Sequence, residues 1–530
     1  MAVSKTATIE SLNPATKEVI GEVPIMSAAQ VEEAVSLAWK AFDQWQFTDY
    51  SYRGRKLLEL RRIIDRRCDE IANLISLEVG KPLVESYLSE LTGPLESCVW
   101  LAENAERYLR DQVIHFTNPL LSSKQSVIAF EPLGVVGVIA PWNYPFAIPM
   151  MSMLACVMCG NTVVLKPSEK SPLVGIKIGE LFKEAGFPEG VVTVITGDRS
   201  TGEHLSRSKL AKIIFTGSVP GGRNVMAQAA PNVVPVTLEL GGKDPAIVLP
   251  DAPIGWTAQG LLWGAFTNAG QACASIERVY IIRSKHTQKL IDTIVAKTKE
   301  LKLGPATDQT TDVGPVIDEA QLSKIERQVE DARARGATVL CGGRRREDLG
   351  GFFYEPTVIT DVDHSMEIMK EETFGPVMPI MIVDSEDEAI EKANDSDFGL
   401  AASVWGANIG RAEAIARDLS TGTVTLNDCL ITHSMPQVPW GGTRRSGIGR
   451  SHGQFGLLDL VNIKHINIDA ASFSPRMWWH PYGQSRVATA RGGLKFLHGG
   501  VFAKPLGLFS FVGNMFVKPN KNPKPNSNGT

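Results

Sequence analysis

Cys273 is the residue of this chain that is best suited to act as a nucleophile. It lies among small residues in the segment FTNAGQACASIERV, shortly before the apolar run VYII. Small neighbours let a substrate approach a thiolate closely, and the thiolate is the nucleophilic form of cysteine. The alternative is a buried thiol without chemistry, which is the commoner state of a single cysteine in an apolar segment.

Two other residues have side chains that could assist such a nucleophile. Glu239 follows alternating apolar residues in VTLELGG, where it could act as a general base or simply face solvent from a strand. Asn143 follows a predicted strand in VIAPWNYPF. Its amide could donate to an oxyanion, a contribution of about 3 kcal/mol for one donor. The alternative for Asn143 is an Asx turn ahead of Pro145.

Two further segments have the composition of a nucleotide site. Lys166 and Glu169, in LKPSEKSP, could hold ribose hydroxyls, or they could mark a charged helix entry with Ser168 as its cap. Gly217 and Ser218, in FTGSVPGGR, form a turn between a predicted strand and a helix start. Backbone N–H groups and the helix dipole favour a pyrophosphate at such a turn.

The helical patterns and short apolar runs of the sequence indicate the fold that would position these residues. Helical patterns cover 27–47, 53–79, 84–111, 146–160, 171–186 and 199–209, and β-branched runs cover 126–132, 135–141, 161–167, 191–197 and 211–217. Strands that alternate with helices predict βαβ crossovers and a largely parallel sheet, with ligands at the carboxyl ends of its strands. A second alternating series from about 245 to 427 predicts a second α/β lobe.

Composition excludes several other classes of protein. The 530 residues are 43% hydrophobic and 21% charged, with a net charge of −4, and this balance argues against a nucleic-acid binder. The seven cysteines are odd in number and irregularly spaced, which indicates reduced thiols. No secretory signal or membrane-spanning run is predicted, so a cytoplasmic location is expected.

Six segments, in this order, resemble the aldehyde dehydrogenase superfamily: PWN, LKPSE, FTGS, LELGGKDP, GQ-x-C and EETFGPV. The resemblance extends over about residues 8–468. It implies a three-lobed α/β fold with a Rossmann-like NAD-binding domain, an α/β catalytic domain and a small β oligomerisation flap. The implied bounds are 8–111 with 132–241 for the NAD-binding domain, 242–440 for the catalytic domain, and 112–131 with 456–470 for the oligomerisation element.

The resemblance also implies a role for each candidate residue. Cys273 would attack the aldehyde, Asn143 and the Cys273 backbone N–H would form the oxyanion hole, and Glu239 would activate the water that hydrolyses the thioester. The implied cofactor-binding residues are Trp142, Lys166, Ser168, Glu169, Gly217, Ser218, Glu372 and Phe374. The implied substrate-tunnel residues are Tyr144, Met151 and Trp440.

The cofactor implied is NAD, with NADP as the alternative, because Glu169 would lie near the ribose 2′-hydroxyl. This chemistry needs no metal. Cys156 and Cys159 lack a second ligand pair and are expected to pack in the core. Two rival functions are acyl transfer to coenzyme A or phosphate, which a hydrolytic base at Glu239 argues against, and a non-catalytic role, which the retained Cys273, Glu239, Asn143 and Lys166 argue against.

Two stretches depart from the family pattern. PWGGTRRSGIG places Trp440 where a smaller ring is common, so the size of the aldehyde is left open. Residues 471–530 form an atypical tail with eight Lys or Arg, no acidic residue and nine aromatic residues. The tail is expected either to contact an anionic membrane peripherally or to pack across the subunits of a homo-oligomer, a dimer or tetramer. Disorder is predicted for residues 518–530.

Overall fold

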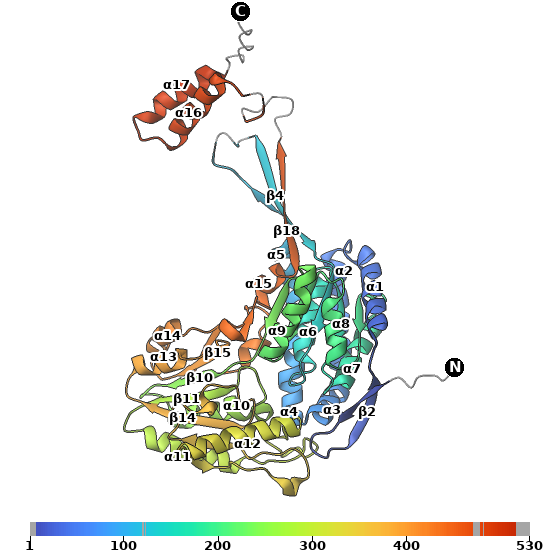
Figure 1. The fold of residues 1–530 in the computed structure, drawn as a ribbon, viewed down its shortest axis with the longest axis vertical. Coiled ribbons are helices and arrows are strands. Elements are labelled where there is room, and N and C mark those ends of the chain that lie inside the picture. The colour runs from blue at the N-terminus through green and yellow to red at the C-terminus, as the bar shows by residue number, and fades with distance from the viewer. Residues whose placement is uncertain (1–6, 119–120, 122, 470–477, 481, 516–530) are drawn as a thin grey trace, which may run out of the picture. The chain divides into compact units, whose positions relative to one another are not determined.

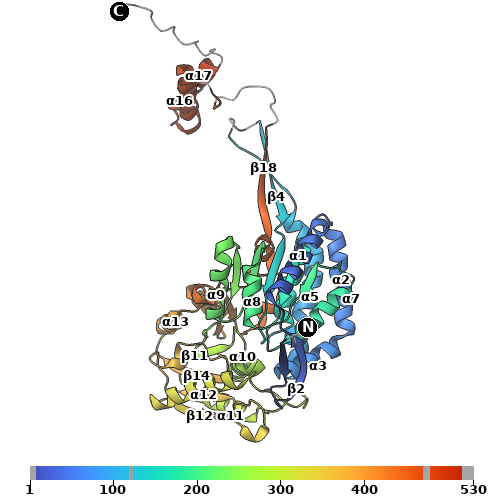
Figure 2. The same ribbon diagram turned by 45° about the vertical axis from the view of Figure 1, so that its right-hand side comes forward.

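The computed structural model describes residues 7–118, 121, 123–469, 478–480 and 482–515. The chain divides into two compact units, 1–109 with 131–462 and 110–130 with 463–530. The first unit contains two large sheets and the second contains two C-terminal helices (Figures 1 and 2). The predicted domain bounds within the first unit stay a prediction.

The first large sheet has the strand order of a dinucleotide-binding fold. Its order is β17-β9-β8-β5-β6-β7, and every pairing is parallel except that of β17 with β9. The strands are β5 (Val135–Ile139), β6 (Thr162–Lys166), β7 (Val192–Val194), β8 (Lys212–Thr216), β9 (Val236–Glu239) and β17 (Gly447–Ile448). The chain order reverses direction between β5 and β8, and open α/β sheets bind ligands at such a switch point.

Helices bury both faces of this sheet. Ser27 opens α1 with a capping box, and α1 packs through Val31 and Val35 against Val135 and Val164. The alternate strand residues are buried as well, as expected for a parallel sheet covered on both sides. The helices of this region are α1 (Ala28–Trp45), α6 (Ala147–Met158), α7 (Pro172–Glu184), α8 (Arg199–Arg207) and α9 (Val219–Ala229).

Two of the predicted N-terminal helices are divided in the structure. The pattern over 53–79 becomes α2 (Tyr50–Arg66) and α3 (Cys68–Val79), and the pattern over 84–111 becomes α4 (Leu83–Glu85), a π-helical segment (Ser86–Leu91) and α5 (Thr92–Leu109). Gly80 ends α3 with a φ of 74°, and a Cβ there would lie 2.5 Å from Pro315 Cγ. Only glycine fits this helix end.

The second large sheet has the order β12-β13-β14-β11-β10-β15-β16, and only the β12–β13 pairing is antiparallel. Its strands are β10 (Asp244–Val248), β11 (Ile276–Ile282), β12 (Thr338–Cys341), β13 (Thr357–Thr360), β14 (Val377–Val383), β15 (Ala401–Trp405) and β16 (Thr423–Leu426). Its helices are α10 (Ile254–Phe266), α11 (Thr287–Glu300), α12 (Glu319–Ala334), α13 (Glu386–Asn394) and α14 (Ile409–Asp418). β13 and α10 were not predicted from the sequence, and α10 is apolar on most sides without a clear helical stripe.

The remaining elements are two small sheets, a short helix and a helical hairpin. β1 (Thr8–Leu12) pairs with β2 (Val19–Pro24), and β3 (Gln112–Ile114), β4 (Lys124–Pro132) and β18 (Val461–Asp469) form a three-stranded sheet. Helix α15 (Gly453–Leu458) precedes β18. In the tail, α16 (Gln484–His498) and α17 (Ala503–Met515) lie side by side (Figures 1 and 2). The disorder predicted for 518–530 lies outside the described residues.

Candidate active site

Cys273 lies in the wall of a large cavity in the first unit. The cavity has a volume of about 990 Å³, and Tyr144 and Trp440 line it together with Cys273. Met151 does not line it. Met151 is buried beside a separate cavity of about 20 Å³ near His452. The structure therefore brings two of the three predicted tunnel residues to the cysteine.

The loop before Cys273 is held in a conformation that few residues adopt. Asn268 and Ala269 have φ values of 50° and 54°, in the left-handed region. Gln271 stabilises the loop, since its side-chain amide donates to Asn268 O at 2.9 Å and its Oε1 accepts from Ile317 N at 2.9 Å. Gly270 is required because a Cβ there would lie 2.1 Å from Gly375 O. This network fixes the backbone that presents the Cys273 thiol.

Asn143 follows β5 and contacts the same loop. Its Nδ2 donates to Gln271 O at 3.1 Å, and its own backbone carbonyl accepts from Asn268 Nδ2 at 3.0 Å. The side chain is buried. These hydrogen bonds join the end of the parallel sheet to the cysteine loop. They place the Asn143 amide at Gln271, two residues before Cys273 in the chain.

Glu239 lies at the carboxyl end of β9, and only one of its two carboxyl oxygens accepts a hydrogen bond. Its Oε1 accepts from the Ser451 hydroxyl at 2.9 Å, whereas its buried Oε2 has no hydrogen-bond partner. Burial raises the pKa of the carboxyl to about 8, and the Ser451 hydrogen bond partly opposes that rise. A carboxyl group with a pKa near neutral and one unpaired oxygen is suited to accept a proton.

The Cys273 thiol is not ionised in this environment. Burial raises its pKa first, and the nearby carboxylates of Asp244, Glu239 and Glu372 raise it further. The backbone N–H of Ala274 acts in the opposite direction. A base must therefore remove the thiol proton before the sulfur can attack a carbonyl carbon.

The residues predicted to bind the adenosine ribose and the pyrophosphate lie at the ends of the two strands that flank β5 in the sheet. At the end of β6, Lys166 Nζ and Glu169 Oε2 form an ion pair at 3.2 Å, and Ser168 Oγ accepts from Lys170 N. After β8, Ser218 caps α9 by accepting from Gly221 N, and Gly217 has no space for a larger side chain, since a Cβ would lie 2.8 Å from the Phe215 ring. A glycine and a capped helix N-terminus at the switch point fit a dinucleotide.

The residues predicted to bind the nicotinamide half come from the EETFGPV segment. Glu372 is held by the Gly242 N–H, which donates to Oε1 at 3.1 Å, and burial raises the pKa of Glu372 to about 7. The Phe374 and Trp142 rings meet edge to face with centroids 5.5 Å apart. A Cβ on Gly241 would lie 2.4 Å from Glu372 Oε1, so glycine is needed beside this carboxylate. Together with the strand-end residues, these groups fit NAD.

Three positioning residues were not identified from the sequence. Ser451 binds Glu239 across 212 positions of the chain, and Asn268 holds the cysteine loop. Glu277 accepts the backbone N–H groups of Thr373 and Phe374 and forms a buried ion pair with Lys243 at 2.7 Å. The one sequence signal available was the position of Glu277 inside the apolar segment IERVYII, since a carboxylate there would be buried and would need partners.

Cys156 and Cys159 are buried within α6, where Cys159 Sγ lies 3.9 Å from Leu457 O. Neither lies in the wall of the cavity that contains Cys273. Their place in the helix agrees with the core packing expected for them.

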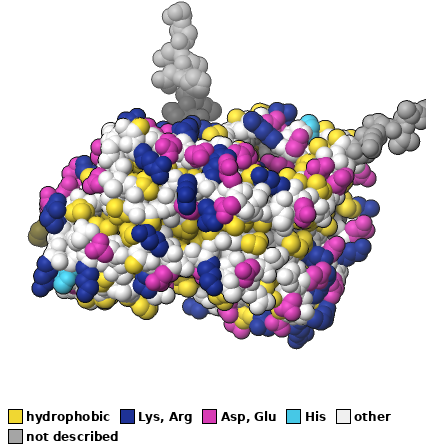
Figure 3. Space-filling view, turned by 90° about the horizontal axis from the view of Figure 1, so that it is seen from below, with side chains coloured by type: hydrophobic (Ala, Val, Ile, Leu, Met, Phe, Trp, Pro, Cys, Tyr) yellow, Lys and Arg dark blue, Asp and Glu magenta, His cyan; other side chains and the backbone are white. Residues whose placement is uncertain are grey.

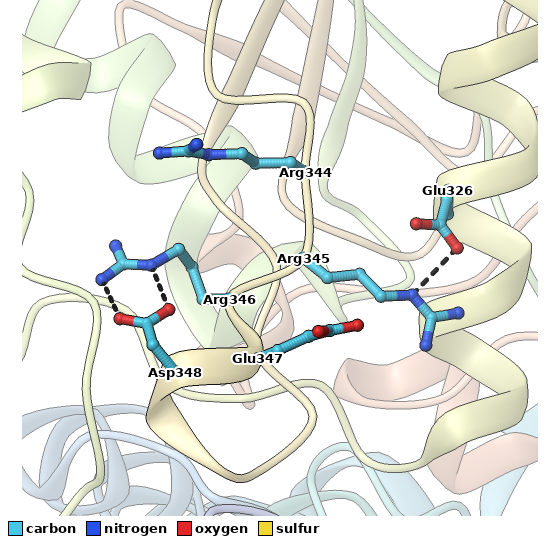
Figure 4. Close-up of a pocket in the computed structure, with 6 residues that line it drawn as sticks. All are labelled: Glu326, Arg344, Arg345, Arg346, Glu347 and Asp348. Atoms are coloured by element: carbon cyan, nitrogen blue, oxygen red, sulfur yellow. Dashed lines mark hydrogen bonds and ion pairs between the residues drawn. The ribbon is translucent and has the colours of Figure 1, made fainter.

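A second depression, of about 540 Å³, lies away from this site beside α12 (Figure 4). It is lined by Arg344, Arg345 and Arg346 with acidic neighbours. Arg345 pairs with Glu326 at 2.9 Å and Arg346 pairs with Asp348 at 2.7 Å. The face of the molecule in Figure 3 likewise shows Lys and Arg interspersed with Asp and Glu. The arginines are therefore neutralised locally and do not form an anion site of their own.

Comparison with known proteins gives a consistent result. The sequence profile of the aldehyde dehydrogenase family matches residues 2–466. The chain is 36% identical to the chloroplastic betaine aldehyde dehydrogenase of Atriplex hortensis over 483 residues, which is 89% of this chain and 95% of that protein. It is 35% identical to the 3-sulfolactaldehyde dehydrogenase of Pseudomonas putida over 460 residues, 86% of this chain and 92% of that protein.

Solved structures agree with the sequence relatives. The betaine aldehyde dehydrogenase of Staphylococcus aureus in complex with NAD⁺ superposes with a TM-score of 0.84 at 36% identity, covering 89% of this chain and 94% of that one. The recognised superfamily, the fold class and the NAD cofactor are thereby confirmed. The chain belongs to the aldehyde dehydrogenase family and oxidises an aldehyde to the carboxylic acid with NAD(P)⁺.

Proposed function

We propose that Cys273 is the nucleophile of this oxidation, with Asn143 as oxyanion donor and Glu239 as the base for hydrolysis. The observation that carries the proposal is the convergence of the three residues. Asn143 donates to Gln271 O in the loop before Cys273, and Glu239 lies near enough for its charge to raise the pKa of the Cys273 thiol. Three groups with these chemistries, contributed by β5, β9 and the loop before β11, suit acyl transfer through a thioester.

The order of events follows from the chemistry of these groups. The Cys273 thiol gives up its proton to water in the cavity, and its sulfur forms a bond to the aldehyde carbon as the carbonyl π bond breaks. The carbonyl oxygen becomes an oxyanion that the Asn143 amide and the Cys273 backbone N–H stabilise. NAD⁺, when bound, accepts the hydride from that carbon. The unpaired Glu239 Oε2 then takes a proton from water, the hydroxyl adds to the thioester carbon, and the carbon–sulfur bond breaks to release the acid.

The cofactor contacts are part of the same proposal. Lys166, Ser168 and Glu169 would hold the adenosine ribose, Gly217 and Ser218 the pyrophosphate, and Glu372, Phe374 and Trp142 the nicotinamide half. The Glu169 carboxylate beside the ribose would disfavour a 2′-phosphate, so NAD is proposed as the preferred cofactor.

Removing the oxyanion donor tests the first step. Asn143→Ala is expected to lower kcat by on the order of 10²- to 10³-fold with little change in KM, because the lost hydrogen bond forms fully only in the transition state. Steady-state NADH formation measures the effect. The exposed helical Asn73→Ala is the matched control, and an unchanged rate of Cys273 alkylation by iodoacetamide checks that the loop has not moved. A kcat within a few-fold of the wild-type value would contradict the role.

The lining of the tunnel favours an uncharged, apolar aldehyde. Apolar and aromatic side chains make up most of it: Leu88, Ile148, Leu262, Trp263, Phe266, Leu301, Val313, Leu430, Ile431, Met435, Tyr144 and Trp440. The buried titratable groups are shifted toward their neutral forms. Burial lowers the pKa of His433 to about 4 and raises that of Glu85 to about 7. A charged substrate would lose its hydration beside these neutral groups.

The outer end of the tunnel is mixed, since the charged residues Lys297, Glu300 and Asp312 line the cavity beside apolar ones. Val84, Leu88 and Trp263 line the cavity and are exposed to solvent. Exposed apolar groups next to a tunnel could contact the far end of a long aldehyde that the buried part cannot enclose. We therefore propose medium- or long-chain aliphatic aldehydes as the substrate class.

A panel of aldehydes tests this class directly. The value of kcat/KM is expected to rise with chain length along an n-alkanal series, by about four-fold for each buried methylene, since one CH₂ contributes about 0.8 kcal/mol. Aminoaldehydes of matched length are the control, and they should be poorer substrates. A preference for the aminoaldehydes would overturn the proposed class while leaving the catalytic residues untouched.

We also propose a homo-oligomer that pairs through the β3–β4–β18 sheet. β18 presents exposed apolar residues that could meet a second subunit, among them Ile463, Ile466 and Ile468.

For the tail we propose peripheral contact with an intracellular membrane. The contact is proposed as peripheral because no helix in the described residues is long and apolar enough to cross a membrane.

A further inference from the structure

The α16–α17 hairpin is held together by close backbone approach at glycines, with the buried Phe511 ring beside Gly493. A Cβ on Gly492 would lie 2.6 Å from the backbone N of Phe511, and a Cβ on Gly507 would lie 2.3 Å from the backbone N of Phe496. Thr489 and Gly493 are also buried along this seam. Small residues that let two helix backbones approach closely are typical of helix pairs in lipid, where apolar side chains gain nothing from facing each other.

Most of the large apolar side chains of the hairpin point outward, whereas Phe511 is buried. Phe502 is 92% exposed, Phe509 79% and Leu506 71%, and Leu494 and Val487 on α16 are exposed as well. A helix pair that is stable in water shows the opposite pattern, with large apolar residues inside. An exposed apolar surface of this kind marks a contact with an apolar partner.

The lengths of the two helices limit the depth of that contact. The 15 residues of α16 and the 13 of α17 correspond to about 22 and 20 Å at 1.5 Å per residue. Both lengths are shorter than the hydrocarbon core of a bilayer, about 30 Å. The hairpin is therefore long enough to enter one leaflet and too short to span the membrane.

The positive charge of the tail favours anionic lipid over a second copy of the hairpin as the apolar partner. From Ala470 to Thr530 the sequence has no acidic residue, and the hairpin carries Arg491, Lys495 and Lys504. Trp478 and Trp479, exposed just before α16, are residues that favour the headgroup region. Basic charges next to an apolar surface attract anionic lipid, whereas two copies of the same hairpin would repel each other.

We propose that the α16–α17 hairpin binds one leaflet of a membrane that contains anionic lipid, through the outward apolar side chains around Phe502 and Phe509. The proposal refines the membrane contact given under the proposed function, on which it rests. It does not depend on the aldehyde chemistry.

Vesicle flotation of the full-length protein tests the hairpin. The wild-type protein is expected to float with phosphatidylcholine vesicles that contain phosphatidylserine, and much less with phosphatidylcholine alone. The double substitution Phe502→Ser with Phe509→Ser should reduce the bound fraction about ten-fold or more, since two large apolar groups no longer enter lipid. Phe47→Ser, at a site that is 82% exposed in the other unit, is the matched control and should float like the wild type.

Charge reversal and oligomer size complete the test. Lys495→Glu with Lys504→Glu should remove the preference for phosphatidylserine. Each variant is checked for folding by its turnover of a short, soluble aldehyde, which should match the wild type. Failure of the wild type to float on either vesicle would overturn the membrane contact as a whole. Flotation that persists in the double phenylalanine variant, or an oligomer that dissociates only in that variant, would overturn the hairpin as the lipid-binding element.

Discussion

Cys273→Ala is expected to lower NADH formation from every aldehyde by on the order of 10⁴-fold or more, because the reaction loses the atom that becomes bonded to substrate. The thiol lies in the wall of the cavity and is held on a loop that Asn143, Asn268 and Gln271 fix by hydrogen bonds. No other cysteine of the described chain lies in that wall. No second thiol among the described residues is therefore placed to replace it.

Steady-state rates and thermal unfolding together measure this prediction. Cys341→Ser is the matched control, since Cys341 lies on β12 outside the cavity, and the control should keep the wild-type rate. The Tm of Cys273→Ala should stay close to that of the wild type, because only one sulfur atom at a cavity surface is removed. Turnover that survives in Cys273→Ala would show that another residue attacks the aldehyde.

Glu239→Gln is expected to produce a burst of NADH followed by a steady-state rate that is lower by about 10²- to 10⁴-fold. The burst should survive because the cysteine and the oxyanion donors are intact, and the acyl-enzyme should then accumulate because no base activates water. Glutamine keeps an oxygen that can accept from Ser451, so the fold at this position is preserved. Rapid-mixing measurement of NADH separates the two phases. Loss of the burst itself would contradict the role in hydrolysis and place Glu239 in the activation of the thiol.

The pH dependence of turnover checks the same residue independently. The raised pKa of about 8 means that Glu239 is mainly protonated at lower pH, and the carboxylate is the form that accepts a proton. Steady-state turnover limited by hydrolysis should therefore increase as pH rises through about 8. Ser451→Ala removes a hydrogen bond that lowers the pKa, so its rising limb should move to higher pH. A rising limb at the same pH in Ser451→Ala would show that another group titrates.

The candidate residues at strand ends could be predicted because one rule of parallel sheets applies to all of them. Asn143, Lys166, Ser218 and Glu239 each follow a run that the sequence indicates as a strand, and carboxyl ends of parallel strands share one edge. The structure places Asn143 and Ser218 after β5 and β8, and Lys166 and Glu239 at the last positions of β6 and β9. Local apolar patterning was sufficient here, since strand order within βαβ units is strongly restricted.

Contacts between distant segments could not be predicted in this way. The pairing of Glu239 with Ser451 depends on β17 returning to β9, and the motif that carries Ser451 contains no signal for it. Met151 was expected in the tunnel, yet its direction is set by the rotation of α6 on the sheet, which no sequence period specifies. The break of 53–79 at Arg67 was likewise invisible in a continuous helical pattern.

The C-terminal tail shows most clearly which properties follow from the sequence and which follow from the tertiary structure. The sequence by itself determined its composition: basic, aromatic, without acidic residues, and interrupted by glycine and proline. Only the tertiary structure decided that the glycines form a seam between two helices and that Phe502, Leu506 and Phe509 face outward while Phe511 is buried. Residue types and their order determine which chemistry a chain can perform, because side-chain chemistry is local. Which groups meet, and which surface is left exposed, depends on packing between segments far apart in the chain.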